Sequence, residues 1–171
     1  MKQHNTLYYY FSNNINTSNV YRIAGFDLDW TLIKPRYAKF PTNPDDIVVM
    51  PNRISTLNKL IKDNYTIVIF SNQKLTNKEP LDFKLKRMDN VIKIFEQNNI
   101  PIILLMAIAD DEYRKPNIGM WTFLREKCPN IKEALYCGDA AGRPNDFSDS
   151  DKQFAQNIRI NFYIPELVFT S

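Results

Sequence analysis

Short apolar runs alternate along this chain with segments whose apolar residues follow the spacing of a helix. The runs are rich in β-branched and aromatic residues and predict buried strands at residues 21–26, 65–70, 101–108 and 134–137. Apolar positions three and four residues apart predict helices at 54–61, at 80–98 and from Pro116 onward, with Trp121, Phe123 and Leu124 facing the core. Residues 157–162 predict a further strand, and residues 7–11 predict a strand at an edge of the sheet.

This alternation predicts a three-layer α/β fold, in which a mainly parallel sheet carries helices on both faces. A chain of 171 residues fits one domain spanning 1–171, with 1–19 as an N-terminal edge segment. In such folds, ligands bind beyond the carboxyl ends of the strands.

The composition argues against a zinc protein, an enzyme with a catalytic histidine, and a secreted or membrane protein. The net charge of +3 and pI near 8.8 permit an anionic partner without demanding one. The two cysteines, Cys128 and Cys137, form no metal-binding motif, and the single histidine, His4, lies near one end, so a catalytic histidine has almost no candidate. We see no secretory signal and no apolar stretch long enough to span a bilayer, so we expect a soluble, intracellular protein.

Polar residues stand at or just beyond the ends of the predicted strands. Asp27 and Asp29 follow the first strand, Ser71 ends the second, Lys115 follows the third after a short loop, and Asp139 follows the fourth. Each of them, taken singly, is typical of a turn, a helix cap or the surface. Because the strands are expected to be parallel, we predict that these side chains meet at one edge of the sheet.

At these residues the chain resembles the haloacid dehalogenase superfamily, and within it the phosphatase domain of polynucleotide kinase 3′-phosphatase. The resemblance runs from about Val20 to Phe169. The stretches that carry it are 25–29 (Gly-Phe-Asp-Leu-Asp), 40–42 (Phe-Pro-Thr), 71–73 (Ser-Asn-Gln), 114–116 (Arg-Lys-Pro), 119–121 (Gly-Met-Trp), 137–144 (Cys-Gly-Asp-Ala-Ala-Gly-Arg-Pro) and 146–148 (Asp-Phe-Ser), followed by Asp151, Phe154, Ala155 and Asn157.

The resemblance implies a reaction and a role for each residue. Asp27 is the expected nucleophile, which forms an aspartyl-phosphate, and Asp29 is the expected general acid and then general base. Ser71 would donate to a phosphate oxygen, and Lys115 would neutralise the phosphate and the nucleophile. Mg²⁺ would bind the Asp27 carboxylate, the Asp29 carbonyl, Asp139 and waters, with weaker support from Asp146. The residues expected to bind substrate are Thr31, Asn72, Arg114 and Arg143.

Two departures from the family pattern affect the substrate side of the site. Trp30 stands where the family usually has glycine after the second aspartate, so either the backbone is ordinary there or an aromatic face lines the site. After Gln73 the family tends to carry a loop with glycine and arginine, whereas this chain has Lys-Leu-Thr-Asn-Lys at 74–78. A DNA contact from that loop therefore does not transfer to this chain.

The resemblance implies a DNA 3′-phosphatase that leaves a 3′-hydroxyl for repair. We see no phosphate-binding loop of a kinase and no room for a large cap domain, and an open site suits a polymer end. The expected partner is DNA with 3′-phosphate ends at nicks, gaps or strand breaks, and the expected protein is a monomer. We expect it to act in the nucleus or another site of DNA repair or replication, and a viral source is possible. The alternatives are a phosphatase for a small phosphorylated metabolite and a catalytically silent module that binds DNA ends.

Overall fold

The computed structural model describes residues 1–170. Within them, the strands form a seven-stranded sheet in the order β1-β2-β7-β6-β3-β8-β9 and a two-stranded ribbon, β4-β5. The strands are β1 (Lys2–His4), β2 (Leu7–Phe11), β3 (Arg22–Phe26), β4 (Ile33–Lys34), β5 (Val48–Val49), β6 (Thr66–Asn72), β7 (Ile102–Ala107), β8 (Glu133–Cys137) and β9 (Asn161–Tyr163). The helices are α1 (Arg53–Lys62), α2 (Leu81–Gln97), α3 (Gly119–Lys127), α4 (Ser150–Ile158) and α5 (Pro165–Val168), with a 3₁₀ turn at Thr17–Asn19.

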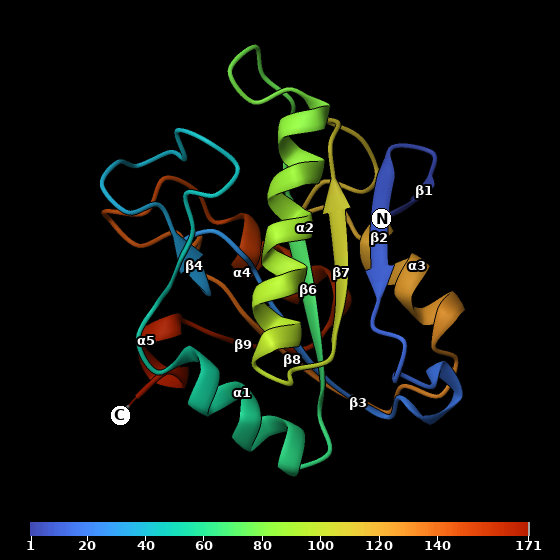
Figure 1. Cartoon of the computed structure of the whole chain (residues 1–171). Coiled ribbons are helices and arrows are strands. Elements are labelled where there is room, and N and C mark those ends of the chain that lie inside the picture. Colours follow the sequence, from blue (N-terminus) through green and yellow to red (C-terminus); the bar gives the residue numbers. More distant parts are fainter. Residues whose placement is uncertain (171) are drawn as a thin grey trace.

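The centre of the large sheet is parallel. Strands β7, β6, β3, β8 and β9 run in the same direction, whereas β2 pairs antiparallel with β7, and β1 folds back on β2 as a hairpin (Figure 1). Parallel neighbours need crossover connections, and the helices provide them. The carboxyl ends of β3, β6 and β8 consequently lie side by side at one edge of the sheet.

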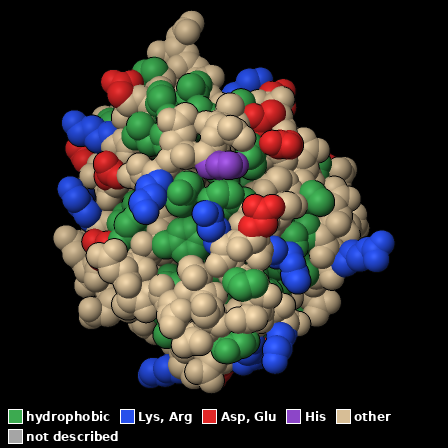
Figure 2. All heavy atoms as spheres, turned by 90° about the vertical axis from the view of Figure 1, so that its right-hand side faces the viewer, with side chains coloured by type: hydrophobic (Ala, Val, Ile, Leu, Met, Phe, Trp, Pro, Cys, Tyr) green, Lys and Arg blue, Asp and Glu red, His purple; other side chains and the backbone are tan. Residues whose placement is uncertain are grey.

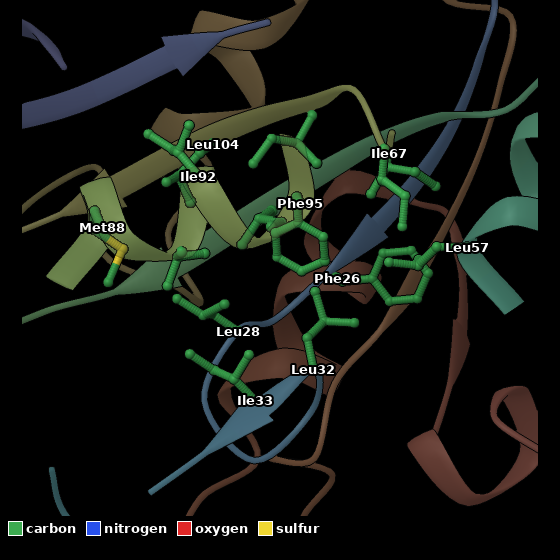
Figure 3. Close-up of a cluster of buried hydrophobic side chains, with 14 of the residues drawn as sticks. Phe26, Leu28, Leu32, Ile33, Leu57, Ile67, Met88, Ile92, Phe95 and Leu104 are labelled. Carbon is green, nitrogen blue, oxygen red and sulfur yellow. The ribbon is translucent and has the colours of Figure 1, made fainter. Parts of the chain in front are cut away.

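Successive residues of the central strands contribute to two different cores. In β6, Ile67 and Ile69 pack with α1 and α2, while Val68 and Phe70 pack with α3 and α4. This is expected, because side chains alternate between the two faces of a sheet. Figure 3 shows the first core, in which Phe26 of β3 and Phe95 of α2 meet between the sheet and the helices. The predicted three-layer α/β fold with a mainly parallel sheet is confirmed.

Two predicted elements differ from those observed. Residues 157 and 158 belong to the end of α4, and the last strand, β9, begins only at Asn161, so the predicted strand at 157–162 was misplaced. Helix α4 buries Phe154 and Ala155, but the buried carboxylate of Asp151 on the same face interrupts the apolar pattern. Helix α3 begins at Gly119 instead of Pro116, because Pro116 lies in a turn that the Asn117 N–H closes by donating to the carbonyl of Arg114.

The connection between β3 and β6 adds a small projecting element to the sheet. It contains the β4-β5 ribbon, the loop at residues 35–47 and helix α1, and Figure 1 shows this loop beyond the ribbon. Among residues 1–170, neither this connection nor the one between β6 and β7 holds a separate folded domain over the sheet edge. The expectation of no large cap is therefore confirmed for the described chain.

The face formed by β1, β2 and α3 has a mixed surface. Figure 2 shows apolar side chains there interspersed with charged ones, and the single histidine lies among them. His4 is exposed and belongs to β1, and its ring centroid lies 5.5 Å from that of Phe123. No helix within residues 1–170 has both the length and the apolar character needed to cross a membrane.

Candidate active site

The sheet brings the predicted polar residues to one edge. Asp27 directly follows β3, Asp139 is the second residue after β8, and Ser71 is the last residue but one of β6. Lys115 reaches the same point from the loop between β7 and α3, and its Nζ lies 2.9 Å from Oδ1 of Asp27. Asp27 and Lys115 are separated by 88 positions in the sequence. The predicted convergence of these side chains is therefore observed.

A tight turn after β3 fixes the first aspartate. The carbonyl of Leu28 accepts from the N–H groups of Thr31 and Leu32, at 3.3 and 2.9 Å. This turn buries Thr31. The Oγ1 atom of Thr31 lies 3.4 Å from Oδ2 of Asp27 and 3.3 Å from Oδ1 of Asp139. The same atom accepts from the main-chain N–H of Asp139 at 3.1 Å. Thr31 thus lies between the two carboxylates and holds them in place.

Lys115 is held by three oxygen atoms. Its Nζ donates to Asp27, to the hydroxyl of Tyr136 at 2.8 Å and to Oδ1 of Asp151 at 2.8 Å. Burial lowers the pKa of Lys115, but the carboxylates of Asp151 and Asp27 outweigh this effect, so the net shift is upward. Lys115 is consequently charged at neutral pH and oriented toward the first aspartate.

Asp151 accepts from protein donors on both of its oxygens. Oδ1 accepts from Lys115 and from Tyr136, and Oδ2 accepts from the N–H of Ala140 at 3.0 Å. Gly138 is required for this approach, because a Cβ at that position would collide with the Asp151 carboxylate. With its oxygens already occupied, Asp151 serves to orient Lys115.

The site has an excess of negative charge that suits a cation. Oxygens of Asp27, Asp139 and Asp151 lie within 4.8 Å of one another, and within residues 1–170 only one ammonium group, that of Lys115, bonds to them. Burial, and next the charge of Asp151, raise the pKa of Asp27 well above its ordinary value, and burial likewise raises the pKa of Asp139. Carboxylate oxygens are ligands that hard divalent cations prefer, so this cluster is a candidate metal centre.

Two donors hold the carboxylate of Asp29. Its Oδ1 accepts from Nη2 of Arg87 at 2.8 Å, and its Oδ2 accepts from Nε2 of Gln73 at 2.7 Å. Gln73 also donates to Oγ of Ser71 at 2.8 Å, which links the second aspartate to the serine. Ser71 is almost fully buried, so its hydroxyl reaches only the interior of the site.

Three of the residues predicted to bind substrate already bond to protein groups. Both polar atoms of the Asn72 side chain bond to the main chain of Lys115, at 3.0 and 2.9 Å. Arg143 bonds to Asp146 and Glu166 and donates to the carbonyl of Asp139 at 3.2 Å. The guanidinium of Arg114 makes a long ion pair, at 3.9 Å, with the exposed Asp110 of the same loop. These contacts position the loops that carry Lys115 and Asp139.

Trp30 has the backbone conformation that favours glycine. Its φ is 63°, in the left-handed region where a non-glycine residue is strained. The alternative that the backbone is ordinary at Trp30 is therefore wrong. The indole Nε1 donates to the carbonyl of Lys39 at 3.2 Å and ties the turn to the projecting loop. Tyr37 and Phe40 of this loop expose their rings, and so does Phe147, the residue after Asp146.

The residues that sequence reasoning left without a role are Gln73, Arg87, Tyr136 and Asp151. Asp151 lies three and four positions before the buried residues Phe154 and Ala155, so a charged group on an apolar helix face was the available signal. Arg87 gives the same signal on α2, one position before Met88. Tyr136 lies in a strand and gives no such signal, because a buried tyrosine is ordinary there.

The fold is that of phosphatases of the haloacid dehalogenase type. Among solved structures, the chain is similar to a haloacid dehalogenase-like phosphatase from Mesorhizobium loti, with a TM-score of 0.75 and 15% identity over 93% of this chain and 78% of that one. It is also similar to a D,D-heptose 1,7-bisphosphate phosphatase from B. bronchiseptica, solved with magnesium and phosphate, with a TM-score of 0.62 and 16% identity over 85% of this chain and 80% of that one. At these identities the likeness establishes the fold.

The chain belongs to the polynucleotide kinase 3 phosphatase family, whose model matches residues 22–169. It is 38% identical over 156 residues to a 20.8 kDa protein of Autographa californica nuclear polyhedrosis virus, covering 85% of this chain and 84% of that protein. It is 40% identical over 156 residues to the bifunctional polynucleotide phosphatase/kinase of Schizosaccharomyces pombe, covering 86% of this chain and 37% of that enzyme. It is 31% identical to the polynucleotide 3′-phosphatase of Arabidopsis thaliana, covering 86% of this chain and 24% of that enzyme. The expected family is confirmed, and the chain matches only part of the two named enzymes.

Proposed function

We propose that this protein is a magnesium-dependent polynucleotide 3′-phosphatase that removes the 3′-phosphate from DNA ends and leaves a 3′-hydroxyl. The observation that carries the proposal is the pairing of the partly buried Asp27 with the buried Lys115 beside Asp139, in a chain that belongs to the polynucleotide kinase 3 phosphatase family. The named relatives act as polynucleotide phosphatases or phosphatase/kinases, which supports the same class of substrate here.

Phosphate transfer to the protein is the first step. An oxygen of the Asp27 carboxylate attacks phosphorus, the bond between phosphorus and the 3′-oxygen breaks, and its electron pair goes to that oxygen. Asp29 gives its proton to the leaving oxygen, so a 3′-hydroxyl departs and Asp29 is left ionised. Lys115 offsets the charge of the phosphate, and the hydroxyl of Ser71 donates to one of its oxygens.

Water releases the phosphate in the second step. The Asp29 carboxylate takes a proton from a water molecule as the water oxygen attacks phosphorus. The bond between phosphorus and the Asp27 oxygen then breaks, inorganic phosphate leaves, and both aspartates return to their initial state. The same two carboxylates therefore serve both steps.

The donor set fits Mg²⁺. The carboxylates of Asp27 and Asp139 and the main-chain carbonyl of Asp29 would hold the ion, since all are hard oxygen donors. When bound, Mg²⁺ neutralises charge on the phosphate and on the attacking carboxylate. Asp151 would keep its place against Lys115, because its oxygens already accept from three donors.

The edge of the sheet favours a polymer end as the substrate. The element that projects beside the site is the β4-β5 ribbon with its loop, which carries Arg36, Lys39 and exposed aromatic rings. Basic side chains attract phosphodiester backbones, and exposed rings offer surfaces on which bases stack. We propose that the protein acts as a monomer on nicks, gaps or strand breaks during DNA repair or replication.

Phosphate release from a 3′-phosphorylated oligonucleotide tests the proposal. We expect turnover with Mg²⁺ and none with a chelator or in the Asp27→Asn variant, while a 5′-phosphorylated oligonucleotide of the same sequence stays intact. Preference for sugar phosphates over DNA ends would favour the metabolite phosphatase instead. Binding to DNA ends with no hydrolysis would favour the silent module.

A further inference from the structure

Two donors from different elements hold the Asp29 carboxylate. Arg87 approaches Oδ1 from helix α2, and Gln73 approaches Oδ2 from the residue after β6. The amide of Gln73 has a defined orientation, because its oxygen accepts from Nζ of Lys84 at 3.0 Å and its nitrogen must therefore face Asp29. Both oxygens of the carboxylate consequently have fixed directions.

Arg87 is an unusual residue for its position. Its side chain is 1% exposed, and its neighbours on the buried face of α2 are Met88 and Val91. Its Nε is buried without a hydrogen-bond partner within the described residues. Asp29 is the acidic partner that the structure gives it, at 2.8 Å. A buried charge with an unsatisfied donor is costly.

Stability does not account for this arginine. Replacing a buried ion pair with apolar residues is often neutral or stabilising. The Asp29 side chain is 35% exposed, so water would solvate its carboxylate if Arg87 were absent. Burial of this arginine therefore lowers the stability of the fold, and residues that lower stability in this way commonly serve the reaction.

We propose that Arg87 is a positioning residue that fixes the Asp29 carboxylate for proton transfer to the leaving 3′-oxygen. A general acid must lie within hydrogen-bond reach of the atom it protonates. A carboxylate held by one donor turns more freely about its side-chain bonds than one held by two. The inference rests on the proposed function, in which Asp29 is the general acid.

Two oligonucleotides that differ in one atom test the inference. One carries an ordinary 3′-phosphate, and the other has sulfur in place of the bridging 3′-oxygen, so its leaving thiolate needs no proton. The rate of the first step is measured under single-turnover conditions as release of the oligonucleotide with a 3′-hydroxyl or 3′-thiol, which precedes the attack of water. It is compared for the wild-type protein, for Arg87→Met and for Arg87→Lys, together with the dissociation constant for DNA. The uncatalysed hydrolysis of the sulfur substrate is subtracted.

We expect Arg87→Met to slow release from the oxygen substrate by about 10–100-fold, since a displacement of about 1 Å costs this much. The same variant should change release from the sulfur substrate by less than about 3-fold, because general acid help is then not used. DNA affinity should stay within about 2-fold, and Arg87→Lys should regain most of the lost rate, because it restores a charged donor. Val91→Ala is the matched control on α2, because it weakens the core one turn further along without touching Asp29.

Equal losses on both substrates, an unchanged rate on the oxygen substrate, or a loss seen only in DNA affinity would each overturn the role of Arg87. If Arg87→Met does not fold, Arg87→Gln takes its place, and its rates on the oxygen and sulfur substrates are compared in the same way. Failure of the proposed function is distinguishable, because the wild-type protein itself would then release no phosphate from the oxygen substrate.

Discussion

The change of Asp151 to asparagine should destabilise the protein, because it removes a buried charge and leaves one donor unpaired. The carboxylate accepts from Lys115, Tyr136 and the N–H of Ala140, at 2.8, 2.8 and 3.0 Å. An amide has one oxygen and one NH₂ group. In either orientation its NH₂ group faces at least one of these donors, so a buried donor loses its acceptor.

The expected loss of stability combines two destabilising effects with a compensating one. A buried donor without a partner costs about 1–3 kcal/mol, and breaking a buried ion pair costs about 3–5 kcal/mol. Lys115 keeps Asp27 as a partner, and the loss of Asp151 relieves the repulsion that helps to raise the pKa of Asp27. We therefore expect a loss of about 2–3 kcal/mol, which corresponds to a fall in Tm of roughly 5–10 °C for a chain of this size.

Thermal and urea unfolding with a chelator present measure this loss, so that bound metal does not compensate for it. Asp149→Asn is the matched control, because this neighbouring aspartate is exposed and bonds only to Gln153 among its described partners. The control should change the free energy of unfolding by less than about 0.5 kcal/mol. An Asp151→Asn variant as stable as the control would refute the reasoning.

Four further predictions concern the reaction and the projecting loop. Asp27→Asn should lower turnover by several orders of magnitude, since both the nucleophile and a metal ligand are lost, and retention of a tenth of the activity would remove Asp27 from its role. Asp29→Asn should nearly abolish release from DNA 3′-phosphate, by about 10²–10⁴-fold, yet spare the burst of alcohol from an aryl phosphate, and equal losses would rule it out as the acid. A chelator should stop turnover without unfolding the protein, and added Mg²⁺ should restore it; activity that survives chelation would contradict the metal assignment. The N–H groups of Arg36 and Thr42 hold the pKa of Asp46 below its ordinary 3.8, so this carboxylate stabilises the loop above that pH and releases it as the pH falls through the lowered pKa. Circular dichroism or NMR of the loop should therefore stay constant from pH 7 to 5 and change below pH 4, and a change near pH 6 would contradict this.

Several site residues were identifiable from the sequence because their positions depend on backbone rules. A residue directly after a buried parallel strand lies at the ligand-binding edge of the sheet, whatever else the fold contains. Asp27, Ser71 and Asp139 were predicted on this basis, and the structure brings them to one edge. The motif at 137–144 then indicated the family, which the comparison with its model confirms.

Other features depended on contacts that no local pattern contains. Helix α4 was missed because buried Asp151 interrupts its apolar face, and that aspartate is buried only because Lys115 and Tyr136 lie opposite it. Trp30 showed where the chain departs from its family, but its positive φ and its bond to Lys39 become visible only once the turn is formed.

The sequence by itself determined the layered fold, the strands and the edge at which the acidic residues gather, because side-chain periodicity and strand ends are local properties of the chain. Only the tertiary structure decided which donor holds each carboxylate. Asp29 and Arg87 are 58 positions apart, and Asp27 and Lys115 are 88 positions apart. Such pairs meet because crossover connections place β3 beside β6 and β8, and because the close packing of side chains between these elements fixes their directions.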